Sequence, residues 1–255
     1  MKLGICAGID RIKELEGLGF DYIEPMLSPI AALPGKEYET LKETALSSSL
    51  PVLGFNVLFP GDLPLMQGEG GHQAIRDYLT LAFARARALG ARNVVFGSGK
   101  ARSRPEGMDY FTAWRNLREV AALVAREAAR HGLQVHLEPL GRKECNMVCS
   151  LSEAAGLVAS VNHPSLSLLT DYYHMATNGE SMEEIRRLPT VGYAHIARHA
   201  GRRYPTKADK EELRPFIQAL KATRFDGFLS IEGHSENMVK DAPEAIAAIR
   251  ELWRE

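Results

Sequence analysis

Short apolar runs alternate with helical patterns along the whole chain, and this alternation constrains the fold more than any other feature. Eight runs have the length and composition of buried strands, and helical segments separate and follow them. The predicted strands are residues 2–6, 21–24, 52–56, 93–96, 134–137, 166–171, 191–196 and 227–232. Most are continuously apolar, as expected when helices cover both faces of a parallel sheet.

The clearest helical period runs from Ile75 to Leu89, where apolar residues recur three and four positions apart and Gly90 ends the helix. The other predicted helices are residues 10–18 with Asp10 as the N-cap, 37–47, 110–131, 152–160, 181–188, 209–223 and a last helix with Asp241 as the N-cap. Eight strand–helix units in 255 residues leave about 32 residues for each, which suits βαβ units.

These observations predict an α/β protein, a single (β/α)8 TIM barrel domain spanning residues 1–255. A doubly wound sheet is the alternative. Its dinucleotide-binding form has little support, because no Gly-x-Gly-x-x-Gly follows the first strand.

Charge and hydropathy argue against several classes of function. With 31 Lys and Arg against 32 Asp and Glu, the formal net charge of −1 argues against general binding to nucleic acid or anionic membranes. No apolar run approaches the roughly 18 residues of a membrane span, and the N-terminal MKLGICAG has no signal-peptide pattern. Three cysteines without a CxxC pair indicate reduced thiols. We therefore expect a cytoplasmic protein.

Four successive strands end in a side chain that can bind a metal. Glu138 follows the fifth strand, where Pro139 stops the ladder, and Asp171, His195 and Glu232 lie at the ends of the next three. In a (β/α)8 barrel these ends open onto one mouth, where active sites lie. Three converging carboxylates repel one another unless a cation lies between them. With one imidazole they favour Mn²⁺, Mg²⁺ or Co²⁺, and Zn²⁺ is less expected without cysteine.

Each of these residues has an ordinary alternative when it is considered alone. Asp171 suits a helix or turn cap, and His195 suits a satisfied position in the core. Glu138 and Glu232 suit ion pairs with Arg. Their occurrence on four successive units favours the metal site.

Further polar residues can reach the same mouth. Glu144 follows Glu138 by six residues and His174 follows Asp171 by three, with a surface charge and an exposed loop histidine as the alternatives. Arg202 and Arg203 could grip sugar hydroxyls or an anion, or form a solvated basic pair. Residues 97–107, GSGKARSRPEG, resemble a phosphate cradle but lack the Gly-Lys-Ser/Thr ending of a P-loop, so they contact substrate or form a mobile loop.

The runs HLEPLGRKE, TDYYHM, GYAHIA, RRYP and LSIEG together resemble the D-tagatose 3-epimerase, or ketose 3-epimerase, family of the xylose isomerase-like TIM barrel superfamily. The resemblance is best over residues 134–232, and DYYHM and AHIA look especially like relatives that act on keto-glycosides. It implies one divalent metal ion, usually Mn²⁺ or Co²⁺, whose ligands are the counterparts of Glu138, Asp171, His195 and Glu232.

The same resemblance implies that Glu144, His174 and Arg202 bind the O1–O3 end of a sugar, with Arg203 in place of Arg202 in a shifted alignment. Gly141 stands where epimerases commonly have Asn, which leaves the hydroxyl specificity open. Analogy with such barrels also implies a homodimer or homotetramer.

The expected reaction is proton transfer next to a ketone. Metal coordination of the carbonyl and neighbouring hydroxyl oxygens stabilises the enediolate formed when the carbon-bound proton leaves. One carboxylate must remove that proton, and a second, protonated one must return it on the opposite face. Glu138 and Glu232 are the predicted acid/base pair as well as metal ligands.

The sequence leaves other functions open. An aldose–ketose isomerase would move the proton between C1 and C2, a lyase would use the same enolate chemistry, and a non-catalytic barrel would only bind metal and sugar. An endonuclease IV-type nuclease shares the barrel and the Asp-x-x-His feature. It needs extra histidines where Asn56 and Gly97 stand, and an Asp-x-His that this chain lacks.

Overall fold

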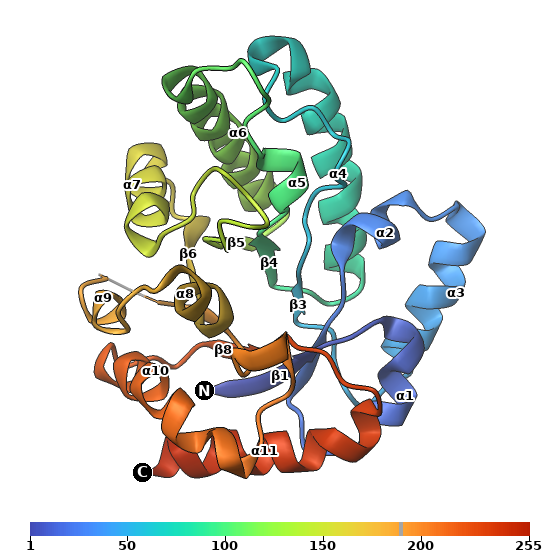
Figure 1. Ribbon diagram of the computed structural model, residues 1–255. Helices are drawn as coiled ribbons and strands as arrows, with labels where there is room; N and C mark the ends of the chain where they lie inside the picture. The colour runs from blue at the N-terminus through green and yellow to red at the C-terminus, as the bar shows by residue number, and fades with distance from the viewer. Residues whose placement is uncertain (189–190) are drawn as a thin grey trace.

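The computed structural model describes residues 1–188 and 191–255, and Figure 1 shows the strands in the middle with helices around them. Eight parallel strands form one sheet in the order β2-β1-β8-β7-β6-β5-β4-β3. Isolated parallel bridges from Ile23 to Val52 and from Met26 to Asn56 join the two edges, so the sheet is nearly closed. The structure confirms the predicted (β/α)8 barrel, and the doubly wound alternative is wrong.

The described elements have the following bounds. The strands are β1 (Lys2–Cys6), β2 (Tyr22–Glu24), β3 (Gly54–Phe55), β4 (Asn93–Phe96), β5 (Gln134–Leu137), β6 (Leu166–Asp171), β7 (Tyr193–Ile196) and β8 (Phe228–Ile231). The helices are α1 (Ile12–Leu15), α2 (Leu27–Ala32), α3 (Gly35–Leu46), α4 (His72–Ala88), α5 (Gly99–Arg102), α6 (Tyr110–Arg130), α7 (Leu151–Val161), α8 (Tyr172–Asn178), α9 (Glu183–Arg186), α10 (Lys210–Ala222) and α11 (Met238–Arg254). Short 3-10 turns are η1 (Ile9–Arg11), η2 (Gly68–Gly71), η3 (Ala200–Arg202) and η4 (Lys207–Asp209). Among the described residues, no helix combines the length and apolar character needed to cross a bilayer.

Side-chain alternation along the strands decides which residues face the interior of the barrel. On β7, Tyr193 and His195 share one face, and Tyr193 packs in a small interior cluster with Tyr22. Ala194 and Ile196, on the other face, belong to the large core that also contains the buried side chains of the helices. His195 therefore lies directly above an aromatic layer that fills the barrel.

Two predicted helix starts are wrong. Asp10 lies inside η1, after Gly8, and its side chain caps no helix. The helix that follows, α1, ends after Leu15. At the other end of the chain, the Asn237 side chain accepts the backbone N–H of Lys240 at 3.1 Å, so α11 begins at Met238. Asp241 consequently lies in its first turn.

Three short helices, α2, α5 and α8, are absent from the sequence prediction. α8 matters most for the site, because it begins immediately after β6 and makes His174 a helical residue. It has 7 residues, too few for an apolar period to stand out from the neighbouring strand.

Candidate active site

The four strand-end side chains predicted from the sequence lie together at one mouth of the barrel. Glu138 follows β5, Asp171 ends β6, His195 lies in β7 and Glu232 follows β8. Asp171 and His195 are register partners on neighbouring strands. One ligand atom from each of the four residues lies within 4.8 Å of the others. The four residues are far apart along the chain, but the C-terminal ends of the parallel strands meet at one mouth of the barrel and bring them together.

His195 is at the centre of this cluster. Its Nδ1 lies 3.1 Å from Oε1 of Glu138 and 3.1 Å from Oε2 of Glu232. Oδ2 of Asp171 is 3.9 Å from the same nitrogen. The imidazole is completely buried, so little solvent screens these charges.

Asp171 performs two tasks with its two oxygens. Oδ1 accepts the backbone N–H of His174 at 3.2 Å and caps α8. Oδ2 is buried and has no hydrogen-bond partner among the described residues. A buried carboxylate oxygen without a partner is costly, and a cation among the four side chains would satisfy it. The set of three carboxylates and one imidazole therefore fits a divalent cation that prefers oxygen ligands.

Glu24, at the end of β2, contacts the other side of His195 and was not predicted as part of the site. Its Oε1 lies 3.0 Å from Nε2 of His195. Its Oε2 accepts the Tyr193 hydroxyl at 2.6 Å and also accepts the hydroxyl of Ser230. Cys6 lies close by, with its sulfur within 4.8 Å of ligand atoms of Glu24 and His195.

The residues predicted to bind substrate lie at the edge of the cluster. His174 is almost fully buried, and its Nδ1 accepts the backbone N–H of Gly141 at 3.0 Å. Glu144 is half-exposed, with Oε1 3.8 Å from the same nitrogen. The exposed-loop alternative for His174 is therefore wrong. A methyl group at Gly141 would lie 3.4 Å from His174, so the residue that departs from the epimerase pattern also allows this close contact.

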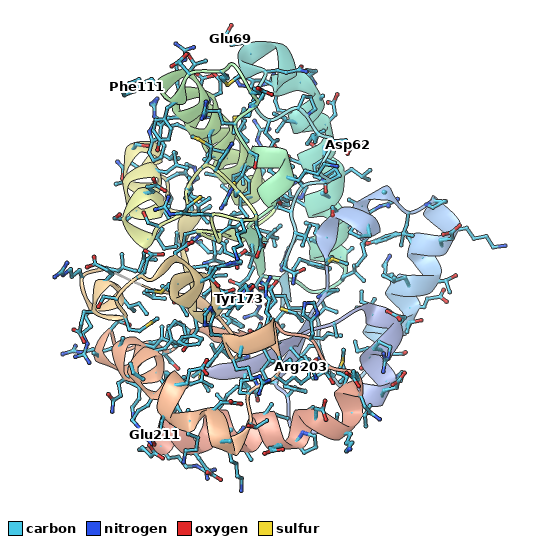
Figure 2. All side chains as sticks on the ribbon, in the orientation of Figure 1. Asp62, Glu69, Phe111, Tyr173, Arg203 and Glu211 are labelled. Carbon is cyan, nitrogen blue, oxygen red and sulfur yellow. The ribbon has the colours of Figure 1, made fainter. Side chains whose placement is uncertain are left out.

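Arg202 joins these residues to the cluster. Its NH2 lies 2.6 Å from Oε2 of Glu232 and 3.8 Å from Oδ2 of Asp171. Its guanidinium also lies 4.7 Å from the centre of the Tyr173 ring. In Figure 2, Tyr173 and Arg203 lie near the middle of the view, close to the strand ends. The Arg203 side chain reaches Glu236 at 3.4 Å instead, so the structure brings Arg202 rather than its neighbour into the cluster.

The charges of the cluster shift its pKa values in opposite directions. Burial and the negative charge of Glu232 raise the pKa of Glu138. Burial would raise the pKa of Glu232 too, but the positive charges of His195 and Arg202 lower it. Burial would lower the pKa of His195, but the charges of Glu24 and Glu232 raise it well above its usual value. Two carboxyl groups with separated pKa values suit one proton donor and one acceptor.

Residues 97–107 contain the short helix α5 (Gly99–Arg102), and residues 103–107 after it form turns and irregular backbone. Arg102 is fully buried and donates to the backbone oxygens of Phe96 at 3.0 Å and Val148 at 3.2 Å, so it attaches the segment to the core. At the start of the segment, a methyl group at Gly97 would lie only 2.3 Å from Oε2 of Glu138. Gly97 therefore leaves room for that carboxylate.

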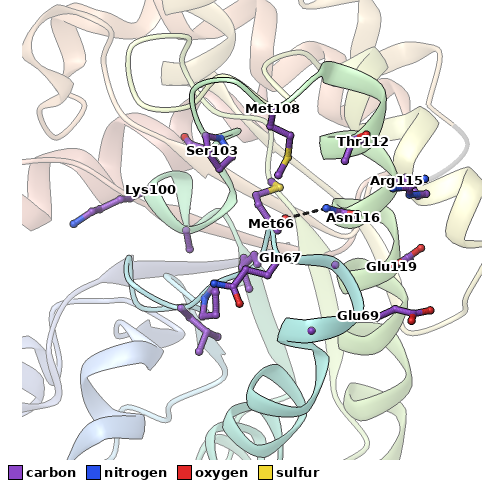
Figure 3. A pocket seen from close by; sticks show the side chains of 17 residues that line it. Met66, Gln67, Glu69, Lys100, Ser103, Met108, Thr112, Arg115, Asn116 and Glu119 are labelled. Atoms are coloured by element: carbon purple, nitrogen blue, oxygen red, sulfur yellow. Dashed lines mark hydrogen bonds between the residues drawn. The ribbon is translucent and has the colours of Figure 1, made fainter.

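A separate cavity of about 1130 Å³ lies between the segment before α4 and the start of α6 (Figure 3). Asn116 of α6 donates to the backbone oxygen of Met66 at 2.9 Å and joins the two walls. None of the four clustered side chains lines this cavity. It is therefore distinct from the barrel mouth.

Comparison with known proteins places the chain in a family. The family described as xylose isomerase-like TIM barrel matches residues 12–255. A putative hydroxypyruvate isomerase of Danio rerio is 26% identical over 233 residues, which are 86% of this chain and 81% of that protein. The 3-dehydro-D-guloside 4-epimerase of Escherichia coli (strain K12) is 26% identical over 108 residues, 42% of this chain and 40% of that protein.

Among solved structures, a D-psicose 3-epimerase crystallised in the presence of D-fructose superposes with a TM-score of 0.85 and 19% identity over 100% of both chains. At 19% identity, this similarity shows that the two proteins share a fold and does not show a shared activity. The family match covers nearly the whole chain, including every strand from β2 to β8 and all four clustered side chains. The chain belongs to the xylose isomerase-like TIM barrel family.

Proposed function

We propose that this protein is a divalent-metal-dependent sugar epimerase of the isomerase class, acting on a ketose or a keto-glycoside. The observation that carries the proposal is the convergence of three carboxylates and one imidazole at the barrel mouth, with one ligand atom of each within 4.8 Å of the others. Similarity to the D-psicose 3-epimerase and the 3-dehydro-D-guloside 4-epimerase supports a sugar substrate.

The metal would be held by Glu138, Asp171, His195 and Glu232. Oδ2 of Asp171, which has no hydrogen-bond partner among the described residues, supports this assignment. The oxygen-rich set favours Mn²⁺, with Mg²⁺, Co²⁺ and Zn²⁺ as the other candidates. When bound, the ion would polarise the substrate carbonyl and stabilise the negative charge that develops on the substrate oxygens.

Glu138 and Glu232 are also assigned the proton transfers. Each carboxylate directs one oxygen at His195. The other oxygen of Glu138 faces Gly97, and the other oxygen of Glu232 lies 3.4 Å from Nδ2 of Asn56. Each carboxyl group thus keeps a second oxygen for the substrate. One removes the proton from the carbon next to the carbonyl, and the other delivers a proton to the opposite face, so only the configuration changes.

Glu144, His174 and Arg202 are assigned to the substrate hydroxyls. The half-exposed Glu144 lies 3.7 Å from Arg202 and 3.8 Å from His174, so these three groups form one polar wall beside the cluster. A carboxylate, an imidazole and a guanidinium together offer acceptors and donors to neighbouring hydroxyl groups.

An aldose–ketose type isomerase is the second candidate. Of the relatives compared above, the putative hydroxypyruvate isomerase has the longest sequence alignment, over 86% of this chain. Moving a proton between two neighbouring carbons needs the same base and the same cluster. The two reactions differ only in where the proton is returned.

Solvent-deuterium incorporation, followed by NMR, tests the proposal. Ketoses, 3-keto-glycosides and hydroxypyruvate are incubated in D₂O with the protein and Mn²⁺, or with the protein and EDTA. We expect metal-dependent deuteration, and the labelled carbon distinguishes epimerisation from isomerisation. Glu138→Gln and Glu232→Gln should each lower the exchange rate by about 10²- to 10⁴-fold. Near-wild-type exchange in both variants would contradict the acid/base assignment.

A further inference from the structure

Glu24 occupies a layer of the barrel just below the clustered side chains. It is completely buried, and three donors contact its carboxylate from two other strands. Tyr193 lies two residues before His195 on β7, and Ser230 of β8 lies two residues before Glu232, which directly follows Ile231 at the end of that strand. Because side chains alternate along a strand, the residues of each pair face the same side, one above the other.

The hydrogen bonds around Glu24 determine which atom is the donor in its contact with His195. Tyr22 lies 2.7 Å from the Ser230 oxygen, and the hydroxyls of Ser230 and Tyr193 both reach Oε2 of Glu24. An ionised carboxylate only accepts hydrogen bonds. The Nε2 atom of His195, 3.0 Å from Oε1 of Glu24, must therefore be the donor.

This constraint decides which ring nitrogen keeps its hydrogen when the imidazole is neutral, as it must be to bind a metal. In a neutral imidazole with hydrogen on Nε2, Nδ1 carries the free lone pair. Nδ1 faces Oε1 of Glu138, Oε2 of Glu232 and Oδ2 of Asp171 at 3.1, 3.1 and 3.9 Å. A lone pair among three carboxylate oxygens is repulsive without a cation and is the arrangement that binds one.

We propose that Glu24 is a positioning residue that holds His195 in the tautomer and orientation needed to bind a metal through Nδ1. Carboxylates that accept from the distal nitrogen of a metal-binding histidine typically change metal affinity by 10- to 100-fold. This inference rests on the proposed metal-dependent function, because it assigns a partner to one of the proposed ligands. It adds a residue from β2, outside the four ligand-bearing strand ends.

Two variants of Glu24 separate its position from its charge. Glu24→Gln keeps the shape, but an amide can present either an oxygen or an NH₂ group to Nε2, so the tautomer is no longer enforced. Glu24→Asp keeps the charge but shortens the side chain by one methylene, which withdraws the oxygen from the 3.0 Å contact with His195.

A matched control exists elsewhere in the chain. Glu127 of α6 is also a buried carboxylate beside a histidine, with Oε1 3.2 Å from Nε2 of His131. It does not belong to the cluster at the barrel mouth. Glu127→Gln therefore reports the general effect of neutralising a buried Glu–His contact.

The experiment titrates the metal-free wild-type protein and the three variants with Co²⁺, and follows the visible absorption of the bound ion. Circular dichroism checks the fold of each. We expect both Glu24 variants to bind Co²⁺ about 10- to 100-fold more weakly, with an altered spectrum, and Glu127→Gln to match the wild type.

The other possible results of the Co²⁺ titration would contradict the inference in different ways. Wild-type affinity and spectrum in Glu24→Gln would overturn the inference and leave the proposed function standing. Wild-type behaviour in Glu24→Asp alone would show that only the charge matters, which overturns the positioning role. If the wild-type protein binds neither Co²⁺ nor Mn²⁺, the proposed metal site fails, and this inference fails with it.

If a Glu24 variant does not fold, the double variant Tyr193→Phe with Ser230→Ala replaces it. This variant removes the two hydroxyl donors to Oε2 of Glu24 and should also weaken Co²⁺ binding.

Discussion

The backbone N–H of His174 donates a hydrogen bond to Oδ1 of Asp171 at 3.2 Å, while the other oxygen of this carboxylate has no hydrogen-bond partner among the described residues. One side chain therefore begins α8 and also faces the cluster at the barrel mouth. The two interpretations of Asp171 from the sequence, helix cap and metal ligand, are compatible because each uses a different oxygen.

Substitutions of Asp171 should separate these two tasks. Asn is as good an N-cap as Asp, so Asp171→Asn should keep the stability of the fold, whereas Asp171→Ala should lose about 1 kcal/mol. Both should lose most of the Mn²⁺ affinity, since an amide or a methyl replaces the charged ligand. Urea unfolding without metal and Mn²⁺ titration give the two quantities. Asp171→Asn binding Mn²⁺ as tightly as the wild type would contradict the ligand assignment.

Alanine at Gly97 should disturb Glu138 specifically. The added methyl group would lie 2.3 Å from Oε2 of Glu138, a contact that only movement of the carboxylate can relieve. We expect a folded protein in which exchange falls by about 10²-fold, since misplacing a reacting group by about 1 Å has effects of that size. Gly156→Ala is the control, because among the described residues no atom outside the adjacent backbone of α7 lies within 4 Å of its added methyl group. With this substitution α7 should gain about 0.5–1 kcal/mol. Equal activity in the two variants would refute the prediction.

The neighbouring arginines should differ in importance. Arg202 pairs with Glu232 at 2.6 Å, and its side chain is 20% exposed, whereas the Arg203 side chain is 54% exposed and pairs with Glu236 at 3.4 Å. Arg202→Ala should lower kcat/KM by about 10²-fold, because it removes the cation beside Glu232 and Asp171. Arg203→Ala should stay within about twofold. Steady-state kinetics on the substrate identified by deuterium exchange measures kcat/KM of both variants. A larger loss in Arg203→Ala than in Arg202→Ala would favour the alignment in which Arg203 takes the place of Arg202.

Removing the metal should lower thermal stability. A ligand present at about 100 times its Kd adds about 2.7 kcal/mol to the folded state. For a chain of 255 residues this corresponds to a rise in Tm of roughly 5–10 °C. Calorimetry with EDTA and then with excess Mn²⁺ measures the difference, and Asp171→Ala should show a much smaller one. An identical Tm under both conditions in the wild type would argue against a metal site in the folded protein.

The thiol of Cys149 should react slowly in the folded protein. Burial and the neighbouring Cys145 raise its pKa to about 11. At pH 8 only about one molecule in a thousand then carries the thiolate, against roughly a quarter for a free cysteine. Native labelling by iodoacetamide should rise about tenfold per pH unit towards pH 11, whereas labelling in denaturant should be fast throughout. Peptide mass spectrometry follows the modification, and rapid native labelling at pH 8 would contradict the shift.

The strand ends were predictable because local signals mark them. Polar residues or proline interrupt short apolar runs, and the bounds of β1, β4, β5 and β6 agree with the prediction. Glu138, followed by Pro139, is the clearest example. Once the barrel is assumed, the C-terminal ends of β5 to β8 must meet at one mouth, so the cluster follows from the topology.

Glu24 shows what the sequence could not reveal. It is followed by Pro25, as Glu138 is by Pro139, but nothing local says which side chain it will contact. Its partner His195 is 171 positions away and lies on a strand that is not its neighbour in the sheet. Contacts across the inside of a barrel depend on its closure and on side-chain sizes, such as the Tyr193 ring beside Glu24. α8 was missed for a different reason, because its 7 residues make only about two helical turns, too few for an apolar period to stand out.

The contact between Glu24 and His195 also bears on how the protein could be divided. A fragment from β5 onwards would keep Glu138, Asp171, His195 and Glu232, and would appear self-sufficient from its sequence. It would lack the carboxylate that faces Nε2 of His195. The first strands therefore do more than close the barrel: β2 supplies a carboxylate that contacts the proposed metal site, so two separated halves of the polypeptide would have to associate to complete that site.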